Sequence, residues 1–276
     1  RAINWVPTEP ATLMWAEALD GGDPRTKADE RDKLMRIAMP FNGEASEVVR
    51  IKQRYQGRAF GERNGLMLYY DYDRDTQRRR IFATDYRDAS NVKLLSDLNV
   101  NDRYNDLGSP VMKMLPSGVS VIAQQGDDIF LQGTGASPDG DRPFFRRMNI
   151  KTLAVTEIFR SEKESYESFV GMVNEDGTQF ITRRESPKDP PNFYMHQRCP
   201  PATNCIAVYD RKITDFKDNA PQLRGITKQL VKYKRDDGVD LSFTLYLPPG
   251  YKPGTRLPTV VWAYPLQFTD NSTAGQ

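Results

Sequence analysis

The two cysteines and the single histidine of this chain, residue types that often carry chemistry, lie in one short stretch. Cys199 and Cys205 enclose Pro-Pro-Ala-Thr-Asn, a spacing that permits a disulfide closing a small loop. We predict this disulfide, with two unpaired thiols as the alternative; it would favour an oxidising compartment, periplasmic or secreted. A metal site is not expected, because the pair is not a Cys-x-x-Cys motif and His196 would be the sole imidazole ligand.

Composition and charge argue against several classes of partner. The formal net charge is +2 with acidic and basic residues interspersed, so no nucleic-acid surface is predicted. The locally basic residues 77–81 are interpreted as the solvated face of one strand. No run approaches the ~20 apolar residues of a membrane helix, and we predict neither a membrane partner nor a cofactor. The sequence opens at Arg1 without a methionine, so we expect an upstream segment to have been lost, and the compartment cannot be read from this end.

Short aromatic strands separated by Gly- and Pro-bearing turns fill residues 1–215. Residues 66–95, 119–159 and 169–209 can be laid over one another in phase, with a period of about forty to sixty residues that is typical of four-stranded propeller blades. Residues 1–55 are expected to form a further blade, with 20–24 and the charged 25–33 as a long surface loop. Tight turns are expected at three aspartates, Asp127, Asp176 and Asp237.

The predicted fold is therefore all-β, a partial propeller of about four blades of four-stranded antiparallel sheet. A β-sandwich gives similar strand spacing, but three repeats in phase favour the propeller. An open arc of blades exposes unpaired strand edges. We therefore expect missing N-terminal blades, or another chain that closes the arc.

The last part of the chain, from residue 216 onwards, differs in composition from the predicted blades. Residues 216–229 form a polar, Pro-containing connector, which is the predicted domain boundary. Two strands joined at Asp237-Gly238 follow within residues 230–247, then a breaker-rich stretch, 248–258. The apolar run 259–264 (Thr-Val-Val-Trp-Ala-Tyr) predicts a buried strand from the inside of a larger sheet. We assign 1–215 to propeller blades, 216–229 to the connector and 230–276 to the first strands of a truncated second domain.

This order of blades, connector, two-strand entry and apolar strand resembles the prolyl oligopeptidase family of serine peptidases. In that family a propeller caps an α/β-hydrolase domain. Residues 3–15 and 183–194 resemble strand pairs of its blades, and 238–251 resembles the entry to its hydrolase domain. Residues 262–265 (Trp-Ala-Tyr-Pro) with 273–276 (Thr-Ala-Gly-Gln) are similar to its glutamyl endopeptidase-like branch. The resemblance covers essentially the whole chain and implies the start of an α/β-hydrolase domain after the connector.

The sequence departs from this family where the catalysis should be. It contains no Gly-x-Ser-x-Gly elbow, and its one histidine, His196, falls inside the last blade, where we expect it to be hydrogen-bonded near the surface. Without a Ser–His pair no general base activates a hydroxyl. We therefore expect no catalytic residue here and no hydrolysis by this fragment alone. Its predicted partners are peptide substrates in the intact enzyme and the missing hydrolase domain and blades.

The resemblance nevertheless implies two roles for residues of this chain. An aromatic donor after the apolar strand, Trp262 or Tyr264, would hydrogen-bond the oxyanion of acyl transfer, with packing at a strand end as the alternative. Arg183 or Arg184 would hold the acidic side chain of a substrate cut after glutamate. Because neighbouring residues on a strand point to opposite faces, at most one of these arginines can face the cavity.

Two other readings remain open on the sequence. A stand-alone propeller that binds a protein or peptide has no need of the apolar run 259–264. A sugar-active or lectin-like propeller would carry paired carboxylates beside exposed aromatics, a signature that one sequence does not reveal.

Overall fold

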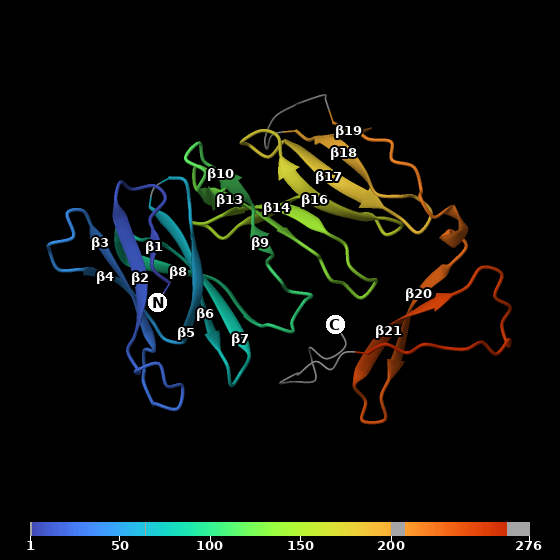
Figure 1. Cartoon of the computed structure of the whole chain (residues 1–276), viewed down its shortest axis with the longest axis horizontal. Helices are drawn as coiled ribbons and strands as arrows, with labels where there is room; N and C mark the ends of the chain where they lie inside the picture. Colours follow the sequence, from blue (N-terminus) through green and yellow to red (C-terminus); the bar gives the residue numbers. More distant parts are fainter. Residues whose placement is uncertain (1, 64, 200–207, 264–276) are drawn as a thin grey trace. The chain divides into compact units, whose positions relative to one another are not determined.

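The chain folds almost entirely into β-strands in a computed structural model that describes residues 2–63, 65–199 and 208–263 (Figure 1). A single 3-10 turn, η1 (Pro221–Leu223), interrupts the strands among these described residues. No helix in the described ranges has the length and apolar character needed to cross a bilayer. The all-β prediction is confirmed.

Four sheets follow the chain order, and each is built like a propeller blade. The first, second and fourth sheets have four strands each, and every neighbouring pair in them is antiparallel. The third has the order β12-β13-β14-β15, with β9 added beside β13. Sequential antiparallel meanders of four strands are the repeating unit of propellers. The partial propeller of about four blades is therefore confirmed.

The strands of these four sheets have the following bounds: β1 (Asn4–Trp5), β2 (Thr12–Ala18), β3 (Asp32–Ala38) and β4 (Ser46–Ile51); β5 (Arg54–Phe60), β6 (Leu66–Asp73), β7 (Arg78–Asp85) and β8 (Asp88–Asn99); β9 (Ser109–Pro110), β12 (Gln124–Gln125), β13 (Asp128–Gly133), β14 (Phe144–Asn149) and β15 (Val155–Arg160); β16 (Tyr166–Met172), β17 (Gln179–Glu185), β18 (Asn192–Gln197) and β19 (Tyr209–Lys212). A separate two-stranded sheet pairs β10 (Met112–Met114) with β11 (Ser120–Ile122).

The sequence analysis located most strands but misplaced part of two blades. The expected loop at 20–33 overlaps the first two residues of β3, and β3, β4 and β5 were not predicted. The sequence of β3, Asp-Lys-Leu-Met-Arg-Ile-Ala, has three charged residues and no aromatic one, and one of its charges, Asp32, is buried. Turns do occur at all three predicted aspartates, Asp127, Asp176 and Asp237.

Contacts within the chain divide it into two compact units. Unit 1 comprises Arg1–Val100, Ser109–Leu131 and Arg146–Thr156, and unit 2 comprises Asn101–Gly108, Gln132–Phe145 and Glu157–Gln276. The domain boundary expected at 216–229 stays a prediction.

The core of unit 1 lies between the first and second sheets. On β2, alternate residues Thr12, Met14 and Ala16 are buried, as the two-residue period of a half-buried strand requires. They pack with buried side chains of the next sheet, among them Met67 and Tyr69. Burial of such side chains contributes about 1.5–3 kcal/mol each and so holds the two blades together.

A buried ion cluster joins the same two blades. Arg54, at the start of β5, donates to Asp32 Oδ1 at 2.7 Å and also to Asp20. Asp20 accepts a further bond from Arg31 Nη1 at 2.9 Å and from the backbone N–H of Gly22 at 2.9 Å. Burial alone would raise the pKa of Asp20, but the bonds from Arg54, Gly22 and Arg31 outweigh burial and lower that pKa to about 2. The cluster therefore depends on an ionised carboxylate.

The C-terminal strands form a separate hairpin. β20 (Thr227–Lys234) pairs with β21 (Asp240–Leu247) through the predicted turn at Asp237-Gly238. The predicted strand after it is wrong for the residues that the structure describes: 259–263 have no strand conformation, and Val260 and Val261 are 94% and 85% exposed. An apolar strand needs neighbours to pair its backbone groups, and the described part of the chain offers it none. The last residue of that run, Tyr264, lies outside the described residues.

We predict that Asp20→Asn lowers the free energy of unfolding of unit 1 by about 2 kcal/mol, because the two guanidiniums lose a charged acceptor. An unfolded aspartate has a pKa of about 3.9. The contribution of Asp20 to the free energy of unfolding is therefore present above that pH and is lost as the pH falls towards about 2. The variant should therefore lose part of the acid-dependent destabilisation over this range. Urea unfolding followed by tryptophan fluorescence checks this, because Trp5 and Trp15 lie in unit 1.

The matched control is Asp23→Asn. The partner of Asp23, Arg25, is 89% exposed in its side chain, and exposed pairs contribute about 0–1 kcal/mol. If both variants shifted the unfolding midpoint equally, the buried cluster would not be what joins the blades.

Candidate functional site

Polar side chains collect on one face of the fourth sheet. In its ladders Glu167 lies opposite Arg184, Thr182 opposite Tyr194, and His196 opposite Asp210. Residues directly opposite share a face, and residues two apart on one strand share it too. All six side chains therefore project to the same side of the sheet.

His196 is at the centre of this group and is fully buried. Its Nδ1 lies 2.7 Å from Asp210 Oδ1, and its Nε2 lies 3.0 Å from Glu167 Oε1 and 2.7 Å from Thr182 Oγ1. The ring stacks on Phe180 at 4.8 Å with an interplanar angle of 7°. The expectation of a histidine near the surface is thus wrong, because the aromatic side chains of neighbouring strands cover it.

Both ring nitrogens of His196 have polar neighbours. The Thr182 hydroxyl donates its one hydrogen to Glu167, so Nε2 faces only lone pairs. Nδ1 lies 2.7 Å from Asp210 Oδ1 and 3.2 Å from Arg198 Nη2. Arg184 pairs with Glu167 and Arg198 with Asp210, so each carboxylate of the cluster has an arginine partner.

The order Thr182, His196, Asp210 has the hydrogen-bond pattern of a hydrolytic triad, but the surroundings rule out that use. Thr182 and His196 are 0% exposed, so no substrate carbonyl can reach the hydroxyl. Glu167 occupies the position beside the hydroxyl where an oxyanion would need donors. The cluster therefore holds the sheet together, and its carboxylate anchors a cation.

The pKa directions agree with a charged, fully bonded cluster. Burial would raise the pKa of Glu167, but bonds from His196, Arg184 and Thr182 outweigh burial and lower it. The pKa of Asp210 is also lowered, since burial is outweighed by Arg198 and His196. The folded chain therefore favours both carboxylates in their ionised form at neutral pH.

The two predicted substrate-binding arginines have different environments. Arg184 Nε donates to buried Glu167 at 2.5 Å, and its guanidinium lies 4.1 Å from the centre of the Tyr194 ring. Arg183 projects to the other face of β17, and both of its terminal nitrogens donate hydrogen bonds to Glu185, at 3.0 and 3.3 Å. The structure thus sets only Arg184 beside the cluster.

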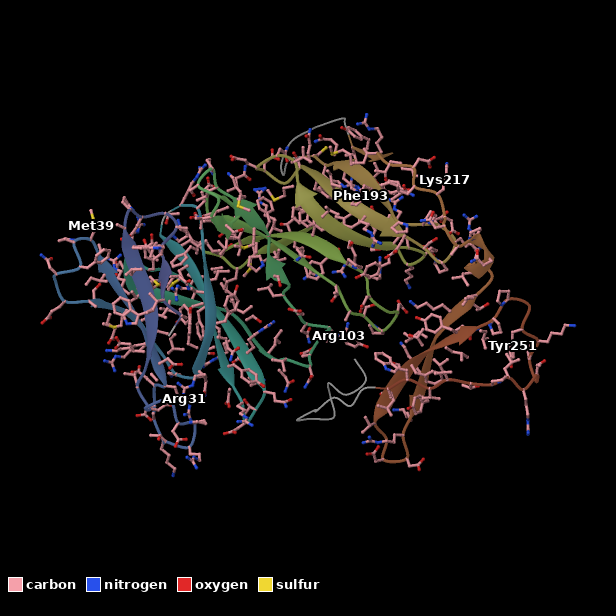
Figure 2. All side chains as sticks on the ribbon, viewed as in Figure 1. Arg31, Met39, Arg103, Phe193, Lys217 and Tyr251 are labelled. Carbon is pink, nitrogen blue, oxygen red and sulfur yellow. The ribbon has the colours of Figure 1, made fainter. Side chains whose placement is uncertain are left out.

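A groove of about 920 Å³ opens at the end of this sheet and has Arg184 in its wall. Its walls come from the segment before β16, from the loop between β17 and β18, and from the segment after β19, where Lys217 is labelled in Figure 2. A second hollow of about 640 Å³ shares the loop between β17 and β18. The groove is large enough for several residues of an extended peptide.

Other predicted site residues lie apart from this groove. Cys199 is disulfide-bonded, and its predicted partner, Cys205, lies outside the described residues. Trp262 is 87% exposed in the segment after the hairpin, and Tyr264 lies outside the described residues. Within the described ranges, no three His, Cys, Asp or Glu side chains gather as metal ligands.

The sequence analysis missed Glu167, Thr182, Asp210 and Arg198. One signal could have found two of them, since Glu167 and Thr182 are polar residues at core positions of aromatic strands. Polar groups at such positions need partners, so they mark a network even when the partners are unknown.

We predict that Glu167→Gln lowers the free energy of unfolding of the fourth sheet by about 3 kcal/mol, because it leaves Arg184 and His196 without their buried charge. The folded pKa of Glu167 lies below that of an unfolded glutamate, about 4.3. Its contribution is therefore present above that pH and is lost as the pH falls further, so the variant should show a weaker pH dependence there. Hydrogen exchange of the amides of β16–β18 measures both effects.

The matched control is Glu162→Gln, which removes the same charge from an exposed position. It should leave hydrogen exchange in β16–β18 unchanged. Equal effects of the two variants would mean that overall charge, and not the buried cluster, sets the stability.

No protein-family model matches the sequence. Two curated proteins match over the whole length of this chain. A protein of Oryza sativa subsp. japonica described as "Probable glutamyl endopeptidase, chloroplastic" is 34% identical over 299 residues, covering 100% of this chain and 31% of the relative. The protein of the same description from Arabidopsis thaliana is 35% identical over 300 residues, covering 100% of this chain and 30% of its own length. The chain thus spans about a third of these relatives.

Solved peptidase structures resemble the chain less closely. Oligopeptidase B from Trypanosoma brucei has a TM-score of 0.49 at 10% identity, covering 93% of this chain and 40% of its own. The propeller domain of the Trilobed protease from Pyrococcus furiosus has a TM-score of 0.39 at 11% identity, covering 75% and 55%. At these scores the assignment depends on the sequence matches and on the blade-like sheets. Over its whole length the chain is similar to part of these glutamyl endopeptidase-like proteins, in agreement with the resemblance to the propeller portion of the prolyl oligopeptidase family.

Proposed function

We propose that this chain is the gating part of a serine peptidase that hydrolyses peptide bonds after glutamate. The observation that carries the proposal is the end-to-end match to two probable glutamyl endopeptidases. A propeller built of rigid blades can restrict a reaction chamber to peptides that are narrow or flexible enough to enter. The chain would then select substrates while the acyl-transfer chemistry occurs on another part of the enzyme.

The residues of the chain agree with this division of labour. The sequence has no Gly-x-Ser-x-Gly elbow, and its one histidine is buried against two carboxylates. A histidine held in that way cannot take a proton from a nucleophile. The catalytic serine, aspartate and histidine of the proposed peptidase are therefore assigned to residues outside this chain.

The C-terminal hairpin supports the proposed start of a hydrolase domain. One face of β20 and β21 carries Val231, Tyr233, Leu241, Phe243 and Leu245 by the alternation of their registers. Tyr233 and Phe243 are both 48% exposed. An isolated two-stranded hairpin is marginally stable, and an apolar face of this kind needs further structure to cover it.

Trp262 or Tyr264 is the proposed oxyanion donor of that enzyme. Trp262 is 87% exposed, so its indole N–H is available to a group brought beside it. A preorganised donor of this kind contributes roughly 3–4 kcal/mol to the transition state. Neither ring can act without a nucleophile beside it.

We predict that the purified chain alone neither reacts with a fluorophosphonate probe, which labels activated serines, nor cleaves internally quenched peptides. The longer natural gene product should do both, with cleavage after glutamate. Active-site labelling resolved by intact-mass analysis measures this, because it identifies the polypeptide that carries the label.

A stand-alone binding propeller gives the opposite pattern. If the natural gene product were no longer than this chain and remained unlabelled, the peptidase assignment would be wrong. Labelling of this chain itself would contradict the proposed division of labour.

A further inference from the structure

Arg184 is anchored on one side and free on the other. Its Nε is bonded to Glu167 at 2.5 Å, which uses one of its five N–H donors. Within the part of the chain that the structure describes, its two terminal nitrogens have no hydrogen-bond partner. Since the Arg184 side chain is 34% exposed and lines the groove, these donors are accessible from the groove.

The guanidinium is also held in place before any ligand arrives. The Tyr194 ring fixes its plane, and Glu167 is itself held by Thr182 and His196. Such a group loses little conformational entropy when it binds, so most of the interaction energy remains as affinity. Two parallel N–H donors in a fixed plane match the geometry of a carboxylate.

We propose that Arg184 is the recognition centre of a carboxylate-binding site in this groove, and that its ligand is a carboxylate carried by a peptide. The terminal nitrogens of Arg184 donate two parallel hydrogen bonds to the ligand. Lys188, in the same groove, has no ion-pair partner among the described residues and supplies a second cation.

The carboxylates that line the groove repel an anionic ligand, but they do not fill the proposed site. Asp215 and Asp218 are bonded to Lys212 and Arg224, at 2.7 and 2.5 Å. Glu185 is paired with Arg183 at 3.0 Å, and Asp189 accepts a bond from the Ser186 hydroxyl at 2.8 Å. Glu162 and Glu164 are exposed and lie in the loop before β16. Charges in solvent are screened, so they weaken binding without preventing it.

The identity of the carboxylate is a separate question. The assignment of this group as the glutamate side chain before a cleaved bond rests on the proposed function. The carboxylate-binding site itself does not rest on that function. A peptide C-terminus offers the same chemistry, so the test must distinguish the two sources.

The test is calorimetric titration of the full chain with three short peptides of one sequence. The first has an internal glutamate and blocked ends, the second has glutamine in its place, and the third has that glutamine and a free C-terminus. We expect the first to bind roughly tenfold more tightly than the second, because a charged bidentate contact is lost with glutamine. Tighter binding of the third than of the first would identify the C-terminus as the ligand. Equal binding of all three peptides would overturn the site.

Two variants test whether the peptide carboxylate binds at Arg184. Arg184→Lys keeps the charge but loses the paired donors, and should weaken binding of the glutamate peptide roughly tenfold. Arg211→Ala is the matched control, since it removes a cation from the other face of the same sheet and should leave binding unchanged. Equal losses in the two variants would show non-specific attraction and reject the site.

Two further variants test the role of the Tyr194 ring without changing any charge, and test whether the site prefers anions or cations. Tyr194→Leu leaves every charge in place and should weaken binding several-fold, because the guanidinium loses the ring that orients it. Glu164→Gln should strengthen binding of an anion, and a weaker affinity would instead indicate a site for cations. Near-ultraviolet circular dichroism of the phenylalanine cluster around His196 reports whether each variant is folded.

The site and the proposed function fail in different ways. If the chain binds the glutamate peptide but Arg184→Lys leaves the Glu-to-Gln ratio of kcat/KM unchanged in the longer enzyme, the site stands and its link to cleavage fails. If the chain does not discriminate the peptides, the site fails whatever the enzyme cleaves.

Discussion

The burial of the Glu167 carboxylate is the constraint on which unit 2 depends. An ion of this size loses several kcal/mol when it leaves water, and only well-placed partners restore that loss. Here the partners come from two further strands, with Thr182 and Arg184 on β17 and His196 on β18. The carboxylate therefore fixes the register of three strands at once. It also determines where the guanidinium of Arg184 can lie.

The same device recurs in the other blades. Asp32 meets Arg54 at the junction of the first and second sheets, Asp71 meets Arg80 within the second, and Asp128 meets Arg147 in the third. Asp32 and Asp71 are 0% and 1% exposed in their side chains. Asp71 and Arg80 lie directly opposite each other on β6 and β7, so their buried ion pair adds to the hydrophobic pattern in fixing the register of the second sheet. Arg80 donates two of its nitrogens to its aspartate, whereas the terminal nitrogens of Arg184 have no hydrogen-bond partner among the residues that the structure describes.

The sequence allowed prediction of what depends on local patterns. Aromatic alternation located β6, β13 and β17, and the turn residues located the hairpin of β20 and β21. It could not reveal the cluster around His196, because Glu167 and Asp210 come from strands whose register is fixed only in the folded sheet. The apolar run 259–263 was read as a strand, but strand formation needs a neighbour to pair with, and composition does not show whether one is present. Of the two adjacent arginines, only the observed pairing of β17 separates the groove-facing one from the other.

An anchored guanidinium on a propeller blade contributes to specificity as well as to affinity. A carboxylate and the amide that replaces it have nearly the same shape, so a cavity wall cannot tell them apart by size. Fixed N–H donors can, because an amide ligand presents one acceptor and an N–H₂ group that faces the second donor unfavourably. Since the selecting group is held by a buried network in the sheet, its geometry does not depend on the loops around the groove. Recognition can therefore reside in the blade while the reaction occurs on another domain, as long as both act on the same peptide.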